Sequence, residues 1–155
     1  MSTTEIVSLL HGFLGTIFLM SFTGAIVSLL TFAQNRFNLL KYSLILMTLT
    51  ILFIDITGIY VYSIYRSSDP ASAKSKILAS ETSWVHTILM EFKEFAGIFV
   101  ALLMLFITSF ALHYKSKILQ EKKLRNSVLI LLIFAMLLTL LTFGLGAYIT
   151  KVQSV

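Results

Sequence analysis

Apolar residues dominate four long stretches of the chain, and polar residues gather between them. The stretches cover about residues 6–33, 42–65, 84–112 and 128–150. Each is longer than the roughly 20 residues that a helix needs to cross the hydrocarbon core of a bilayer. A backbone in hydrocarbon must satisfy its own hydrogen bonds, so we expect these stretches to be helices. The pattern therefore predicts an all-α, integral membrane four-helix bundle that forms a single domain.

The overall composition agrees with this prediction. Hydrophobic residues make up 57% of the 155 residues, and charged residues make up only 12%. A typical soluble domain has about 25% charged residues, so the composition excludes an ordinary soluble fold. The first stretch lacks a basic N-terminal region and is too long for the apolar core of a signal peptide, so we expect it to persist as a helix. The expected location is a cell membrane, which the chain crosses several times.

Basic residues between the stretches predict the orientation of the bundle. Residues 34–41 contain two basic residues and residues 114–126 contain five, whereas residues 66–83 contain three and the C-terminal residues contain one. Connections rich in Lys and Arg stay on the cytoplasmic side of a membrane. We therefore expect a basic cytoplasmic loop at residues 114–126 and a polar external loop at residues 66–83. Both termini are then extracytoplasmic.

Several ionisable residues interrupt the apolar stretches. The third stretch carries His86, Glu91, Lys93 and Glu94, and the second carries Asp55. A residue advances about 100° around a helix axis, so Lys93 and Glu94 share a face with His86, whereas Glu91 points roughly 140° away from His86. Ionisable side chains inside a membrane are costly and mark functional sites. We expect the three carboxylates and Lys93 to form a charge network within the bundle.

Two histidines are expected at a similar depth near the outer surface. A rise of about 1.5 Å per residue places His11 about 33 Å and His86 about 39 Å from the cytoplasmic ends of their helices. Gly12 and Gly15 leave space beside the first imidazole, and Arg66 stands at the same outer edge, where a cation can bind propionate groups. A haem with two axial histidines needs such an arrangement in a helical bundle. The sequence therefore predicts both histidines as ligands of the haem iron.

This layout resembles that of small four-helix membrane b-type cytochromes. The resemblance implies a non-covalent haem b near the outer leaflet and a role as an electron-transfer subunit in a respiratory or quinone-linked chain. The chain contains no cysteine, which excludes covalent c-type haem, iron–sulfur clusters and thiolate metal sites. The expected partners are bilayer lipids, other membrane subunits or further copies of the chain, and a quinone, but no nucleic acid.

Two alternative functions remain open from the sequence. The first is a metal or proton site built from His86, Glu94 and Asp55, with Glu91 as a further member, because imidazole and carboxylate groups together bind copper, zinc, iron or manganese. The second is an accessory or structural subunit of a larger membrane complex that holds no cofactor. Common soluble-enzyme motifs, such as phosphate-binding glycine loops, are absent from the sequence, which leaves open whether the protein is an enzyme.

Overall fold

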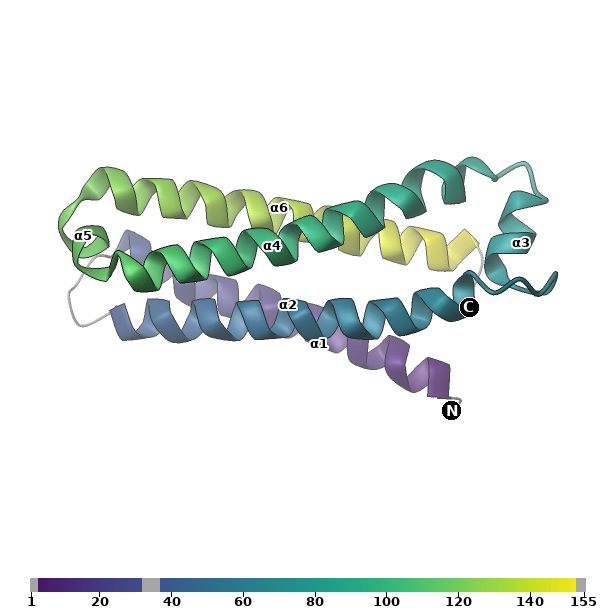
Figure 1. The fold of residues 1–155 in the computed structure, drawn as a ribbon, viewed down its shortest axis with the longest axis horizontal. Helices are drawn as coiled ribbons and strands as arrows, with labels where there is room; N and C mark the ends of the chain where they lie inside the picture. Colours follow the sequence, from purple (N-terminus) through teal and green to yellow (C-terminus); the bar gives the residue numbers. More distant parts are fainter. Residues whose placement is uncertain (1–2, 32–36, 153–155) are drawn as a thin grey trace.

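The computed structural model describes residues 3–31 and 37–152, which are almost entirely helical. Two of the long helices are α1 (Thr3–Leu30) and α2 (Phe37–Tyr65). The third long element begins with a π-helical segment, η2 (Val85–Met90), and continues as α4 (Glu91–His113). The fourth is α6 (Lys122–Val152). These helices run lengthwise beside one another, and the chain begins and ends at the same end of the bundle (Figure 1).

All four long elements are long and apolar enough to cross a membrane. They contain 28, 29, 29 and 31 residues, so each extends for more than about 40 Å, which exceeds the ~30 Å hydrocarbon core. Their outward side chains are also apolar, and Phe95, for example, is 75% exposed. Such a surface is stable in lipid but not in water. The predicted all-α bundle of four apolar helices is confirmed, and the protein is a small four-span membrane protein that contacts the lipid bilayer.

The helices extend beyond the apolar stretches from which they were predicted. α2 begins at Phe37 rather than near residue 42, and α6 begins at Lys122 rather than near residue 128. Residues 114–126, expected as a loop, contain a short helix and the first turns of α6. Hydropathy locates only the apolar part of a helix, and Lys and Arg, which are good helix formers, continue it into the polar region.

Neighbouring helices follow the order α1, α2, α4 and α6 around the bundle, and α6 returns to contact α1. The main core lies between them, and Phe18, Leu44, Met104 and Leu132 are fully buried there. A second, smaller core lies at one end of the bundle. Its residues are Tyr65, Ala73, Ile77, Val85, Met90 and Ile149.

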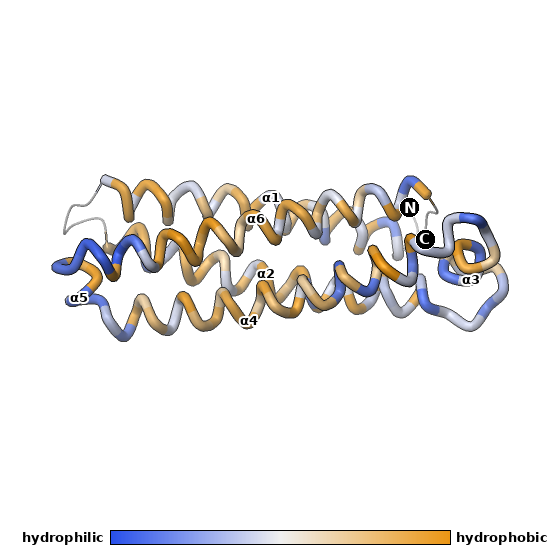
Figure 2. Tube along the Cα trace, turned by 90° about the horizontal axis from the view of Figure 1, so that it is seen from above, coloured by the Kyte–Doolittle hydropathy of each residue, from blue (hydrophilic) through white to orange (hydrophobic). Residues whose placement is uncertain are grey.

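Two short helices cover the two ends of the bundle, α3 (Ala73–Leu78) and α5 (Lys115–Gln120). Both contain the same five residues in order, Lys-Ser-Lys-Ile-Leu. The isoleucine of each, Ile77 in α3 and Ile118 in α5, is only 2% exposed. A six-residue helix is not stable alone in water, so these buried anchors hold it in place. Hydrophilic residues gather at these two ends, which we call the α3 end and the α5 end, and apolar residues lie between them (Figure 2).

Candidate functional site

Ionisable and hydroxyl side chains enter the bundle in the half that is nearer the α3 end. They come from α1, α2, η2 and α4, and we call this group the polar cluster. Its members are His11, Asp55, Thr57, Tyr62, Tyr65, His86, Glu91, Lys93 and Glu94. The cluster contains His11 and His86, predicted as haem ligands, and all four residues of the predicted charge network.

Three ionisable side chains of the cluster each lie against a glycine of the next helix around the bundle. In each pair, a side-chain atom comes within 3.1 to 3.7 Å of the position that a Cβ on the glycine would occupy. The pairs are His11 with Gly58, Asp55 with Gly97, and Lys93 with Gly146. A larger residue would crowd the polar side chain, so these glycines provide the space in which it crosses between helices. The pairing of these glycines with ionisable side chains was not predicted from the sequence, although glycines inside apolar helices are a usable signal.

The two glycines predicted to make space beside a haem have other surroundings. Gly12 has no atom within 4 Å of the position that its Cβ would take, so it faces open space. Gly15 is buried, and the corresponding position lies 3.5 Å from the ring of Phe143 on α6. The space beside this glycine is therefore filled by an aromatic side chain of the same chain.

His11 is hydrogen-bonded across the interface between α1 and α2. Its Nδ1 lies 3.0 Å from the Thr57 hydroxyl oxygen. That hydroxyl donates its single hydrogen to backbone carbonyl oxygens of its own helix, at Phe53 or Ile54. We therefore infer that the imidazole Nδ1–H donates to Thr57, which leaves the Nε2 lone pair available in the neutral tautomer.

His86 connects the buried interior to the surface at the α3 end. The residue is only 4% exposed, and its Nδ1 is hydrogen-bonded at 3.1 Å to the hydroxyl of Tyr65, which is 1% exposed. Its Nε2 lies 3.8 Å from Glu91 Oε1, which also accepts a 3.3 Å hydrogen bond from Arg66. The side chains of Glu91 and Arg66 are about half exposed. One imidazole thus lies between a buried hydroxyl and a half-exposed carboxylate.

The predicted separation of His86 and Glu91 is wrong, and the π-helical segment η2 explains why. A regular α-helix would place these residues about 140° apart, but η2 spans Val85–Met90 and changes the register. A π-helix forms hydrogen bonds between residues i and i+5, so residues five apart come near one another. Glu91 therefore lies beside His86. Single-turn π segments are frequent at functional sites, and hydrophobic periodicity gives no sign of them.

The deeper part of the cluster contains a loosely paired tyrosine and glutamate. The side chains of Tyr62 and Glu94 face each other, but the buried Tyr62 hydroxyl and Glu94 Oε1 form no hydrogen bond of good geometry among the described residues. Lys93 lies within electrostatic range of Glu94 and Asp55 but forms no ion pair with a described carboxylate. A buried polar group without a well-formed hydrogen bond costs about 1–3 kcal/mol, so such a group in a native protein needs an explanation, for example a catalytic role or a bound water.

The structure does not bring the two predicted haem ligands to one point. His11 contacts α2 at Thr57 and His86 contacts it at Tyr65, eight residues further on, which corresponds to about 12 Å of helical rise. Within residues 3–31 and 37–152, no group of three His, Asp or Glu side chains is close enough to hold a metal ion. Arg66, predicted to meet propionate groups, is paired with Glu91 instead.

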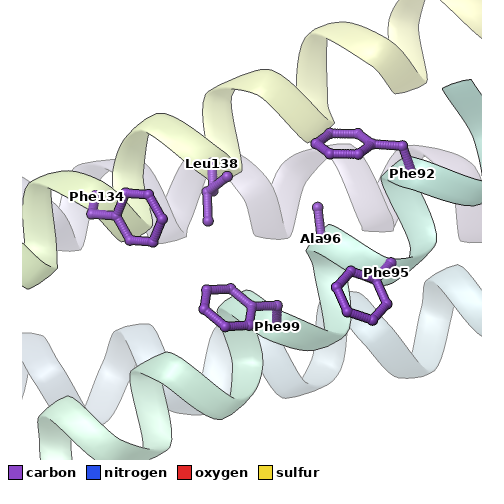
Figure 3. A pocket seen from close by; sticks show the side chains of 6 residues that line it. All are labelled: Phe92, Phe95, Ala96, Phe99, Phe134 and Leu138. Atoms are coloured by element: carbon purple, nitrogen blue, oxygen red, sulfur yellow. The ribbon is translucent and has the colours of Figure 1, made fainter.

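A separate apolar groove lies between α4 and α6 (Figure 3). Its volume is about 220 Å³, and only apolar side chains line it. These are Phe92, Phe95, Ala96, Phe99, Phe134 and Leu138. None of the predicted site residues contributes to this groove, so it is distinct from the polar cluster.

No family model matches the sequence, and no curated protein or solved structure matches it. The assignment of the polar cluster as the candidate site therefore rests on the residues of this chain.

Proposed function

We propose that the protein is a membrane subunit that exchanges protons between water at the α3 end and the interior of the bundle. The position of His86 carries this proposal, because its two nitrogens face a buried hydroxyl and a half-exposed carboxylate near the α3 end. A neutral imidazole accepts a proton at one nitrogen and releases one from the other, which makes histidine a proton shuttle. Chains of histidine and carboxylate groups serve as proton relays in membrane proteins.

The polar cluster extends this path toward the middle of the membrane. Asp55 precedes Tyr65 by ten residues on α2, which places it about 15 Å deeper in the bundle. Between these depths lie Tyr62 and Glu94, whose side chains face each other without a hydrogen bond of good geometry. Groups that are not held in strong ion pairs can accept and release protons. A tight salt bridge would instead fix the charge of each member.

The polar groups of the proposed proton path end near the middle of the bundle, which favours a partner protein that continues the path. The half of the bundle nearer the α5 end is filled by the apolar main core. A proton that reaches Asp55 must then pass to another molecule within the bilayer. This favours an accessory subunit of a larger respiratory or quinone-linked membrane complex, which combines two of the functions left open by the sequence. Following the positive-inside rule, we place the α3 end outside.

The rate of protonation inside the bundle tests this proposal. The protein in lipid nanodiscs receives a rapid pH jump, and time-resolved infrared spectra follow the carboxyl bands of Asp55 and Glu94. Replacing His86 with Phe removes the shuttle, and we expect it to slow protonation by roughly 100-fold, at the low end of what a positioned proton-transfer group contributes. His113→Phe, a change at the opposite end, is the matched control and keeps the original rate. Equal rates in both variants would refute the proposal.

A second candidate function is electron transfer by a non-covalent haem b. One observation favours it: His11 uses Nδ1 for the hydrogen bond to Thr57, which leaves Nε2 for iron. A hydrogen bond at the other ring nitrogen is typical of metal-binding histidines. The Nε2 of His86 would have to move away from Glu91 to become the second ligand, and the haem would supply one-electron transfer.

An optical spectrum of the protein purified in detergent decides between the candidates. A haem held by two histidines gives a Soret band and a sharp reduced α-band, and His11→Ala or His86→Ala should abolish both, whereas His113→Ala should not. A colourless protein in which His86→Phe slows protonation would exclude the haem and support the proton path.

A further inference from the structure

Four lysines form a basic patch at the α5 end, outside the polar cluster. Lys115 and Lys117 belong to α5, and Lys122 and Lys123 begin α6. All four are exposed, and Glu121 is the one acidic residue in the segment 114–126. The patch lies where the apolar spans stop, and Figure 2 shows it as the strongly hydrophilic end of the bundle. In a membrane, this is the level of the lipid headgroups.

No described residue neutralises the charge of this patch. None of the four lysines has an ion-pair partner among the described residues. The Lys115 ammonium lies 5.0 Å from the centroid of the Phe37 ring, and that of Lys117 lies 5.6 Å from the centroid of the Tyr114 ring. These rings orient the two cations without cancelling their charge. Four like charges within nine residues repel one another, so a bound anionic group would reduce this repulsion.

The fold holds the patch in place. Ile118 lies between the lysines of α5 and those of α6, and it is buried in the main core. The same core includes Val128 in the early part of α6. Both α5 and the start of α6 are therefore packed on the bundle, and their lysines stay at the surface of the membrane.

We propose that the basic patch binds the headgroups of anionic phospholipids in the leaflet at the α5 end. Clusters of Lys and Arg directly beside a membrane span attract anionic lipids, with a contribution equivalent to about fivefold in affinity for each basic residue. The proposal concerns a different surface from the proton path and does not depend on it. The occupant is a lipid rather than a soluble anion, because the lysines surround the ends of lipid-facing helices.

The chain supplies its own matched control for this proposal. α3 repeats the Lys-Ser-Lys-Ile-Leu sequence of α5 at the opposite end of the bundle, so Lys74 and Lys76 correspond to Lys115 and Lys117. The segment 66–83 around α3 contains two acidic residues, Asp69 and Glu81, and lacks the further lysine pair that follows α5. Removing the same two charges from identical pentapeptides therefore separates the effect of the site from the effect of net charge.

The experiment measures lipid selectivity of the full-length protein in nanodiscs made of phosphatidylcholine and phosphatidylglycerol. Electron paramagnetic resonance compares how strongly spin-labelled forms of the two lipids associate with the protein. The variants are Lys115→Gln with Lys117→Gln, Lys122→Gln with Lys123→Gln, and the control Lys74→Gln with Lys76→Gln. A fourth variant, Lys115→Arg with Lys117→Arg, keeps the charge and reports any effect of substitution on folding.

We expect the original protein to prefer phosphatidylglycerol and this preference to weaken at high salt. Each pair of Gln changes at the α5 end should lower the preference by about fivefold or more, while the α3 pair and the Arg pair leave it unchanged. An equal loss at both ends would overturn the proposal, and so would an unchanged preference in the α5 variants. Inorganic phosphate should not displace the lipid, and displacement at millimolar concentration would assign the patch to a soluble anion instead.

Discussion

The two ends of the bundle carry the same pentapeptide but differ in what lies beneath it. At the α3 end, Ile77 packs in a small core with Tyr65, and the polar cluster begins directly below. At the α5 end, Ile118 packs on the apolar main core, and the ionisable residues stay outside. An identical local sequence therefore gives the same short, anchored helix at both ends. The neighbouring long helices decide whether charge enters the membrane or remains at its surface.

Glycine positions explain this difference physically. In the half nearer the α3 end, glycines of α2, α4 and α6 each leave room for an ionisable side chain of the preceding helix. In the other half, large apolar residues such as Leu44, Met104 and Leu132 fill the centre completely. Such a close-packed interior has no space for a long ionisable side chain. The depth to which charge penetrates is therefore set by packing, not by the ends themselves.

The largest loss of stability is expected when the buried isoleucine of α3 or of α5 is replaced by alanine. Ile77→Ala and Ile118→Ala each leave a cavity in a core, and we expect each to lower the free energy of unfolding by about 2–5 kcal/mol. Equilibrium unfolding in mixed micelles measures both. Leu78→Ala is the control, because Leu78 is 42% exposed and its loss should have little effect. If only one anchor mattered, the two pentapeptide helices would not be equivalent.

A glycine substitution on α1 tests the packing difference between the two halves. Gly24 lies in the half nearer the α5 end, and a Cβ there would come within 2.5 Å of the Ser43 hydroxyl oxygen on α2. We expect Gly24→Ala to destabilise the protein by about 1–3 kcal/mol, because the Ser43 hydroxyl must rotate away or the two helices must move apart.

Gly12→Ala is the matched control on the same helix, nearer the α3 end. A Cβ at Gly12 meets no atom within 4 Å, and Ala is the better helix former by about 1 kcal/mol. This variant should be as stable as the original protein or more stable in the same unfolding measurement. A destabilised Gly12→Ala variant would mean that α1 is as tightly packed at the α3 end as elsewhere.

The sequence was sufficient to predict the spans but not their ends. Four apolar stretches of membrane length allow few arrangements other than four helices. The polar residues 122–127 resemble a loop in sequence because they interrupt the apolar pattern, yet they form the start of α6. Their helical state depends on α6 continuing behind them and on Val128 packing in the core. Neither condition is visible in a hydropathy profile.

The candidate site was only partly predictable for similar reasons. His86, Asp55, Lys93 and Glu94 are conspicuous because ionisable residues are rare in apolar helices. Their partners Tyr65, Gly97 and Gly146 are ordinary residues of membrane helices, and only the packing of one helix on another shows their role. The contact between His86 and Glu91 depends on the π-helical segment η2, which no periodic pattern indicates.

A smaller effect is expected from Tyr65→Phe at the α3 end. This change removes the hydroxyl that is hydrogen-bonded to His86 Nδ1 and keeps the ring in its core. The loss of one buried hydrogen bond should cost about 1 kcal/mol of unfolding free energy. Tyr60→Phe is the control, because Tyr60 is 41% exposed and its hydroxyl has no partner within the described chain. Equal costs for both changes would show that the imidazole contact does not stabilise this end.

The smallest expected effect concerns a polar contact inside the apolar half. The hydroxyl oxygens of Thr48 on α2 and Thr108 on α4 lie 2.7 Å apart in the buried interface. Each hydroxyl also has a backbone carbonyl of the facing helix within reach, at 3.4 Å for Thr48 and 3.3 Å for Thr108. Either threonine therefore keeps an acceptor when the other is replaced. The contact between them should then be weak.

A double-mutant cycle with Thr48→Val, Thr108→Val and both changes together measures this coupling. We expect about 0.6 kcal/mol, the average for hydrogen bonds between helices in a membrane. Thr16→Val is the control, since that hydroxyl is exposed and bonds only to its own helix. A coupling above about 2 kcal/mol would exceed what such bonds contribute in membranes. The half nearer the α5 end would then depend on polar contacts as the other half does, and packing alone would not account for its stability.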